Sequence, residues 1–373
     1  MITITGTLSK AWMNRAIGTV FDRDYYLDPA KRHTIDSRCN EYAAETFPGM
    51  AVFYSESNLG RIDYWDKNQV LIGGIQPNMI LGMLLGADFV PADDRDADIT
   101  PCCLKNVGWA LAHADNPGAG REEQHGLKPI LPTPGALLNH DLVRLFDQQI
   151  RSTRKERLRP IPPFFWDSSG RAVIHGVLTS AQKLCGESIF MDMLTEPAKC
   201  MGLLNWIADA YIALCRHFAQ AADLPITDVH VGECSCCMVS PALAEEFVAP
   251  ITSRIGEALG PVRFHSCGTS THLLGALTQI DPLGSLDFGS ETSISKAREV
   301  FGLETPITIA PSPQDMSAES TEPILRWAKR VLDENGGGNL GYVFHLEPSY
   351  NIETIYALTD FARHQTGESS SGQ

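Results

Sequence analysis

The sequence has few basic residues for the number of acidic residues it carries. Lysine and arginine together number 30 against 45 aspartate and glutamate residues, a net charge of −15 at pH 7 with histidine neutral. A surface this acidic repels the phosphate groups of nucleic acids. The densest basic run, residues 151–159, also contains Glu156 and is typical of a solvated helix end. The sequence therefore predicts no nucleic-acid partner.

Export and membrane signals are missing as well. The first residues lack the basic and apolar regions of a signal peptide, and no apolar run reaches the ~18 residues that span a bilayer. The ten cysteines do not indicate a disulfide scaffold, because such scaffolds belong to small secreted domains. We therefore expect a cytoplasmic protein with reduced thiols and no membrane association.

No predicted strand is followed by the Gly-x-Gly-x-x-Gly pattern of a dinucleotide-binding open sheet. Instead, from about residue 171 onward, short β-rich runs alternate with amphipathic helical sequence. Strands are expected at 172–176, 228–233, 262–265, 285–288, 307–310 and 341–345, each followed by a helix. Such alternation is typical of a parallel sheet, and its length favours a closed barrel over the competing open sheet.

The first 170 residues are less regular. A strand is expected at 50–54, and helices are expected at 77–85 and 136–156. We predict an α/β fold consisting of a single (β/α)8 TIM barrel over 49–366, with an irregular N-terminal extension over 1–48 that covers one mouth. Residues 367–373 are rich in Gly and Ser and are expected to form a flexible tail.

Ionisable and metal-binding side chains follow several predicted strands at their carboxyl ends, where barrel enzymes place their active sites. They are Glu233, Cys234, His265, Cys267, Asp287, His345 and Glu347. Turn residues such as Gly, Ser and Asn are the ordinary occupants of these positions. A run of strand ends with such chemistry predicts a functional site.

His265 and Cys267 lie two residues apart at the end of a strand. In an extended chain their side chains point to the same side, so both can reach one ion. Imidazole with thiolate favours zinc. Alone, the pair is more often packed in a core than bound to metal, so a third ligand from another strand end is needed. His345 is the first candidate and Glu347 the second, with Cys234 or Cys236 as a rival set.

The segment Glu233-Cys234-Ser235-Cys236-Cys237 is a dense cluster directly after a strand. For Cys236 and Cys237, packing as compact apolar side chains is the favoured interpretation, because adjacent cysteines rarely reach one metal. A carboxylate at a strand end facing a cavity is costly unless it has a function. Glu233 is therefore a candidate for acid–base catalysis. The aromatic run 164–166 is expected either to wall a pocket or to belong to the core.

These residues together resemble the uroporphyrinogen decarboxylase superfamily. The segments that carry the resemblance are Gly176–Gly186, Ser240-Pro241, Phe247–Pro250, Phe264–Gly268 and Ile294–Glu299. The resemblance covers roughly residues 170–365 well and the N-terminal part loosely. True decarboxylases of this superfamily carry an arginine-rich stretch near the N-terminus that holds substrate carboxylates. Here Arg15, Arg23 and Arg32 lie in unrelated contexts.

The other branch of the superfamily comprises zinc-dependent methyltransferases that work with corrinoid proteins. Its signature is His-x-Cys followed by a distant Cys at the last strand. His265 and Cys267 match the first part, and His345 replaces the distant Cys. The resemblance implies zinc held by His265, Cys267 and His345, with Glu233 or Asp287 moving a proton.

That branch implies methyl exchange between a small substrate (a methyl ether, amine or thiol) and cobalamin. The chain lacks an Asp-x-His-x-x-Gly segment, so the cobalamin is expected on a partner corrinoid protein. The direction of transfer stays open, with His345 as third ligand favouring donation to the corrinoid. A metal-free uroporphyrinogen decarboxylase-type lyase is the alternative function. A barrel that only binds a ligand or stores metal is the third.

Overall fold

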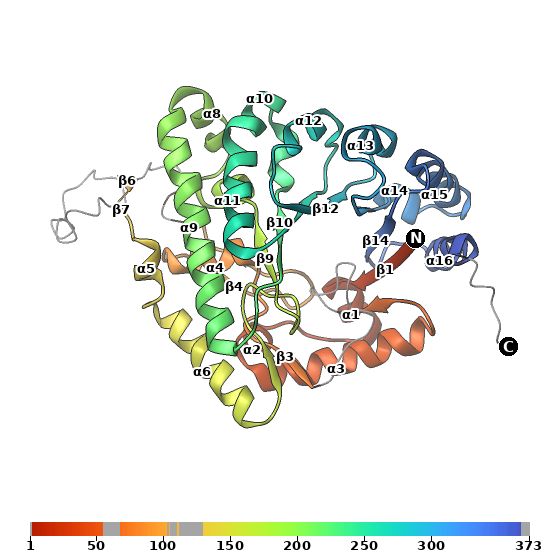
Figure 1. Cartoon of the computed structure of the whole chain (residues 1–373). Coiled ribbons are helices and arrows are strands. Elements are labelled where there is room, and N and C mark those ends of the chain that lie inside the picture. The colour runs from red at the N-terminus through yellow and green to blue at the C-terminus, as the bar shows by residue number, and fades with distance from the viewer. Residues whose placement is uncertain (1, 55–67, 103, 105–109, 112–129, 367–373) are drawn as a thin grey trace.

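The computed structural model describes residues 2–54, 68–102, 104, 110–111 and 130–366. Its centre is one curled sheet of eight strands in the order β2-β1-β14-β13-β12-β11-β10-β9 (Figure 1). All the ladders of this sheet are parallel. The strands are β1 (Ile2–Leu8), β2 (Val52–Phe53), β9 (Arg171–His175), β10 (Asp228–Gly232), β11 (Val262–Ser266), β12 (Leu283–Phe288), β13 (Ile307–Ile309) and β14 (Leu340–Leu346).

Most connections between these strands contain helices. The longer ones are α1 (Lys10–Ile17), α3 (Pro29–Thr46), α4 (Pro77–Leu84), α6 (Asp141–Lys155), α7 (Val177–Cys185), α8 (Ser188–Thr195), α9 (Pro197–Ala222), α11 (Ala249–Leu259), α13 (Ile294–Phe301), α15 (Glu322–Asn335) and α16 (Ile352–Thr366). The short ones are α2 (Arg23–Leu27), α5 (Pro134–Leu137), α10 (Pro241–Leu243), α12 (Leu274–Leu277), α14 (Pro313–Met316) and the single turns η1 (Cys234–Met238), η2 (Ala244–Val248) and η3 (Thr271–Leu273). No helix of the described residues has both the length and the apolarity needed to cross a bilayer.

The predicted alternation of strands and helices from residue 171 onward is confirmed. The closed ring is confirmed only in part, because the ladders of the described residues form a curled sheet with β2 and β9 at its edges. The remaining strands pair two by two: β3 (Gln69–Leu71) with β8 (Arg159–Ile161), β4 (Phe89–Val90) with β5 (Asp98–Ile99), and β6 (Ala110–Leu111) with β7 (Ile130–Leu131).

The N-terminus lies inside the sheet. β1 pairs in parallel with β14 from Ile2 opposite Leu340 to Leu8 opposite Leu346. The alternation of isoleucine and threonine in Ile2–Leu8 is typical of a strand, because β-branched side chains fit a pleated surface. The extension expected over 1–48 is therefore not confirmed, since its first residues form a sheet strand. The tail expected over 367–373 lies outside the described residues.

The helix expected after the strand at 228–233 contains a wider turn than the regular helix that was predicted. Pro250 has no N–H to donate to the carbonyl four residues earlier, and its ring crowds that carbonyl. The chain adopts a π turn over Ala244–Val248 just before it, in which the N–H of Ala249 donates to the carbonyl of Ala244. Beyond this turn α11 continues normally to Leu259.

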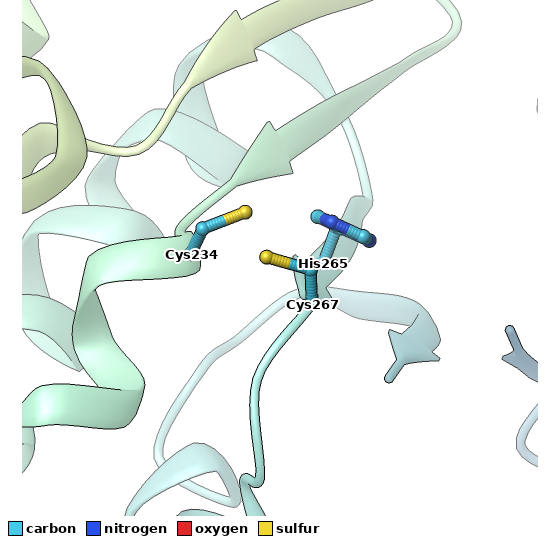
Figure 2. A group of neighbouring side chains, drawn as sticks. All are labelled: Cys234, His265 and Cys267. Atoms are coloured by element: carbon cyan, nitrogen blue, oxygen red, sulfur yellow. The ribbon is translucent and has the colours of Figure 1, made fainter. Parts of the chain in front are cut away.

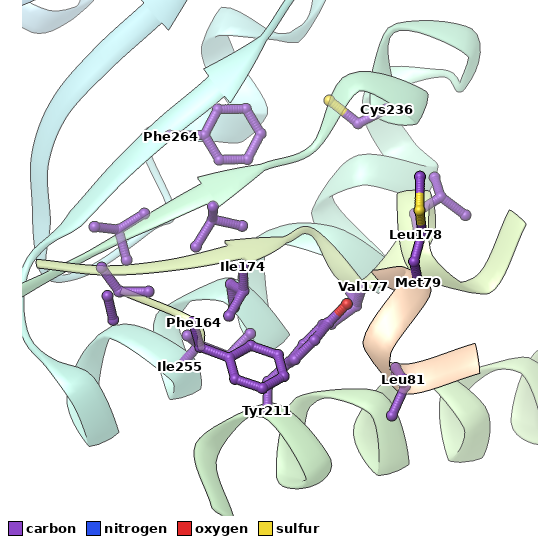
Figure 3. Packing of buried hydrophobic residues seen from close by; sticks show 14 of the residues in the cluster. Met79, Leu81, Phe164, Ile174, Val177, Leu178, Tyr211, Cys236, Ile255 and Phe264 are labelled. Carbon is purple, nitrogen blue, oxygen red and sulfur yellow. The ribbon is translucent and has the colours of Figure 1, made fainter. Parts of the chain in front are cut away.

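The apolar core lies between the sheet and its covering helices (Figure 3). Alternate side chains of the strands, such as Phe264 and Ile174, are buried there. Tyr211 of α9 is also fully buried, and its hydroxyl hydrogen-bonds Ser180 of α7 at 2.7 Å. The opposite alternates face the barrel axis, which leaves polar side chains for the site described next.

Candidate metal centre

Three potential metal ligands meet at the carboxyl ends of two neighbouring strands. Cys234 follows β10, His265 lies in β11 and Cys267 follows β11, and their donor atoms all lie within 4.8 Å of one another. Figure 2 shows the sulfur atoms of the two cysteines turned toward each other, with the imidazole beside them. The register explains the meeting, because Gly232 of β10 pairs with His265 of β11 and the next N–H, that of Glu233, donates to the carbonyl of His265.

The donor set fits zinc. One imidazole nitrogen and two thiolate sulfurs are typical zinc ligands, and three protein ligands leave a fourth position for water or substrate. Cys267 is exposed, and Cys234 and His265 are half-buried, so the cluster is accessible from outside. His265 and Cys267 were predicted as a pair, and the structure brings them together.

Asp287 of β12 fixes the imidazole of His265. Its Oδ2 lies 2.8 Å from Nδ1 of His265 and 3.0 Å from the guanidinium of Arg263. Its Oδ1 accepts a hydrogen bond from the hydroxyl of Thr308 at 2.8 Å. Burial alone would raise the pKa of Asp287, but the charges of Arg263 and His265 hold it well below its usual range. With Nδ1 held by a carboxylate, Nε2 is left for a metal, the usual arrangement in zinc sites.

The ionisation of the metal-free cluster is uneven. Hydrogen bonds from Cys234 and His265 lower the pKa of Cys267 to about 4, against the effect of burial. The same contact with Cys267, together with burial, raises the pKa of Cys234. Burial lowers the pKa of His265, but Asp287 outweighs it and the result is about 9. The cluster thus carries a thiolate beside an imidazolium, and a bound metal would displace the remaining protons.

Glu233, predicted as a catalytic acid or base, is fully buried behind the cluster. Its carboxylate accepts hydrogen bonds from the N–H of Leu178 at 3.1 Å and from the N–H and hydroxyl of Thr179 at 2.7 and 2.8 Å. Burial raises the pKa of Glu233 to about 7 against the effect of these bonds. Glu233 is not among the residues that line the cavity. Its contacts tie the end of β10 to the first turn of α7.

His345, the first candidate for a third ligand, does not belong to the close cluster. Its Nδ1 contacts the hydroxyl of Thr7 on β1, although the side chain lines the same cavity as Cys234 and His265. Glu347, the second candidate, accepts a hydrogen bond from the hydroxyl of Ser9 at 3.0 Å. The structure therefore favours the rival, Cys234. The sequence signal for it was its position directly after the strand that neighbours β11.

A cavity of about 360 Å³ opens beside the cluster. Its walls come from 71–77, from 162–166 and from the ends of β9 and β10, so the aromatic run 164–166 does wall a pocket. Trp166 lies against His230 with ring centroids 4.3 Å apart. His230 and His175 both line the cavity, although neither was predicted as a site residue. The sequence signal for His230 was its position between Val229 and Val231. Because successive residues of a strand face opposite sides, the imidazole points away from the core.

Both of these imidazoles are neutral. Burial lowers the pKa of His175 to about 4, and it lowers the pKa of His230 well below its usual value. Among the described residues, no carboxylate hydrogen-bonds the ring of His175 or His230, whereas Asp287 hydrogen-bonds the ring of His265.

The family follows from comparison with known proteins. The model of the family described as uroporphyrinogen decarboxylase (URO-D) matches residues 174–364, which include β10, β11 and all three donors. The chain belongs to the uroporphyrinogen decarboxylase family. A solved structure, a methyltransferase from Methanosarcina mazei, matches with a TM-score of 0.59 at 14% sequence identity, covering 98% of this chain and 92% of that chain. That likeness shows that this member of the uroporphyrinogen decarboxylase family shares its fold with a methyltransferase. No curated protein sequence matches the chain.

Proposed function

We propose that the chain is a zinc-dependent methyltransferase that moves a methyl group between a small substrate and a corrinoid carried by a partner protein. The observation that carries this proposal is the cluster of Cys234, His265 and Cys267, with donor atoms within 4.8 Å of one another. A nitrogen and two sulfurs form a set that favours zinc over magnesium or calcium. The fold shared with a methyltransferase supports the reaction class.

Within this proposal each residue has a separate task. Bound zinc would supply a Lewis acid at one end of the cavity. Asp287 holds His265 in the tautomer and orientation that a metal ligand needs. Glu233 fixes the backbone directly before Cys234 through its bonds to α7. Glu233 and Asp287 therefore act as positioning residues in this mechanism, and not as the proton carriers expected from the sequence.

The composition of the cavity argues against the alternative, a metal-free decarboxylase-type lyase. A porphyrinogen that carries several carboxylates needs cationic side chains around it. Among the described residues that line the cavity, none is lysine or arginine. Arg263, which lies nearby, is paired with Asp287 and Thr308. The lining therefore favours a small and weakly charged substrate.

The direction of methyl transfer stays open. The reason for favouring donation to the corrinoid was a histidine as third ligand. With Cys234 in that place, the set contains two thiolates, and that reason no longer applies. The assay must therefore run both ways.

The test is elemental analysis of the purified protein together with a methyl-transfer assay. We expect about one zinc per chain in the wild type and loss of zinc in C234A, H265A and C267A. H345A serves as the matched variant, because His345 lines the cavity outside the cluster, and it should keep its zinc. Conversion between cobalamin and methylcobalamin, followed by absorbance, then reports activity. A wild type that binds no zinc after reconstitution, or that shows no transfer in either direction with a panel of substrates, contradicts the proposal.

A further inference from the structure

Two histidines in the cavity wall have a ring nitrogen without a partner. The Nδ1 atoms of His175 and His230 are buried, and in the part of the chain that the structure describes neither has a hydrogen bond. His230 is only 6% exposed. Buried polar atoms are nearly always paired, and leaving one unpaired costs about 1–3 kcal/mol. Two such rings in one wall call for an explanation.

The unpaired nitrogens decide where the ring protons lie. A neutral imidazole has one N–H donor and one acceptor nitrogen. A buried N–H without a partner is rarer in proteins than an underused acceptor. The proton of each ring therefore belongs on Nε2. Nε2 of His230 lies beside Gly232, itself a lining residue, at 3.7 Å from where a Cβ on that glycine would sit. The wall then offers N–H donors and needs an acceptor.

The rest of the wall, outside the metal cluster, has no acidic side chain, lysine or arginine in the described part of the chain. Arg171 beneath Trp166 is neutralised by Asp167, whose Oδ2 lies 2.5 Å away. A charged ligand in such a wall would lose its hydration without gaining a counter-ion, which is costly. An ammonium group has a second disadvantage, because it can only donate hydrogen bonds.

The size of the cavity limits the ligand further. Its volume of about 360 Å³ lies at the lower end of the range of small-molecule pockets, about 300–1,000 Å³. Trp166 and the prolines 162 and 163 supply apolar surface to the wall. A substituted single ring fits this space.

We propose that His175 and His230 donate hydrogen bonds from Nε2 to an oxygen of an uncharged, ring-sized organic molecule. Among the substrate classes considered above, this selects a methyl ether over a methylamine or a thiol. The assignment of the molecule as the methyl-bearing substrate rests on the proposed function, but its binding does not.

Isothermal titration calorimetry tests the inference on the protein as purified and after removal of metal by chelation. The probes are 2-methoxyphenol, benzoate and N-methylbenzylammonium, which have similar sizes and different charges. We expect 2-methoxyphenol to bind and each charged probe to bind at least about tenfold more weakly. H230F and H175F keep a ring of similar size without its nitrogens and should each weaken 2-methoxyphenol about five- to tenfold.

H217F is the matched control, because His217 of α9 is paired with Asp147 and does not line the cavity. It should bind 2-methoxyphenol as the wild type does. Should a phenylalanine variant fail to fold, H230Q provides a second route, since its amide keeps an N–H and should retain more affinity than H230A.

The inference is overturned if H230F and H175F both bind 2-methoxyphenol with wild-type affinity. It is also overturned if a charged probe binds as tightly as 2-methoxyphenol, or if 2-methoxyphenol does not bind at millimolar concentration. The two proposals fail separately. The expected binding pattern without methyl transfer would overturn only the proposed function. Methyl transfer from an amine and not from an ether would overturn only the present inference.

Discussion

Asp287 holds His265 from behind the metal cluster, so its substitution should weaken zinc binding without removing a ligand. In D287N the amide keeps the shape of the carboxylate but loses the charge that orients the imidazole and attracts its proton. Loss of such a carboxylate partner typically costs about 10–100-fold in metal affinity, which is about 1.4–2.7 kcal/mol.

The pH dependence makes this prediction sharper. In the metal-free wild type His265 has a pKa of about 9 and is protonated at pH 7.5. Zinc must displace that proton, so the contribution of His265 to wild-type affinity should rise with pH until about 9. In D287N the main cause of the raised pKa is gone, and the rise should be shallower. The loss of affinity in D287N is therefore largest above pH 9, where the His265 proton no longer competes in either protein and the Cys234 thiol competes equally in both, and it is smaller at pH 7.5.

Competition with a chromophoric chelator at both pH values measures the two affinities. T308V is the control, because Thr308 bonds the other oxygen of Asp287 and leaves the contact with His265 in place. It should change zinc affinity by less than about threefold. Circular dichroism and thermal melting establish that both variants are folded. A folded D287N whose affinity above pH 9 equals that of the wild type would refute the reasoning.

Three further predictions concern stability, each checked by thermal or denaturant unfolding. D167N leaves the buried guanidinium of Arg171 without its carboxylate, so it should lower the free energy of unfolding by about 3–5 kcal/mol. Unchanged stability of D167N would contradict this prediction. G176A places a Cβ 2.0 Å from the carboxylate of Glu233, which should lower the free energy of unfolding by about 1–3 kcal/mol and lower zinc occupancy. A181G, in the helix that Gly176 precedes, should leave zinc occupancy unchanged. R298M removes the buried guanidinium that donates hydrogen bonds to several carbonyls, so it should lower the free energy of unfolding by about 2–5 kcal/mol. R326M, which changes an exposed side chain, should leave the free energy of unfolding almost unchanged.

The parts of the fold that were predictable are those with local signals. Apolar runs ending in polar residues marked β10, β11 and β12, and the two-residue spacing of His265 and Cys267 put both side chains on one face. The N-terminal strand was missed because three of the seven residues of Ile2–Leu8 are threonine and a glycine interrupts them, so only the pairing with β14 makes this segment part of the sheet. The π turn before Pro250 was missed for a related reason, since helix periodicity continues through it.

The site was only partly predictable because it depends on register. Cys234 joins the cluster through the pairing of β10 with β11, and no spacing along the chain states that pairing. His345 lies at a strand end just as the resemblance implied, but its ring contacts Thr7 on a strand that the sequence did not reveal. Glu233 and Asp287 were expected to move protons because they are ionisable at strand ends. Their burial and their bonds are visible only in three dimensions, and in the proposed function they make both residues positioning residues.

The pairing of β1 with β14 also has a consequence for biosynthesis. Thr7 and His345, which touch across this pair, are separated by 338 residues. A ribosome that adds about 5–20 residues per second needs roughly 17–68 s to make that stretch. During this time the alternating isoleucines and threonines of the first strand have emerged while their later neighbour does not yet exist. The edge of β1 that later pairs with β14 is thus exposed in the nascent chain, and chaperone binding at the N-terminus would protect it until the last strand arrives.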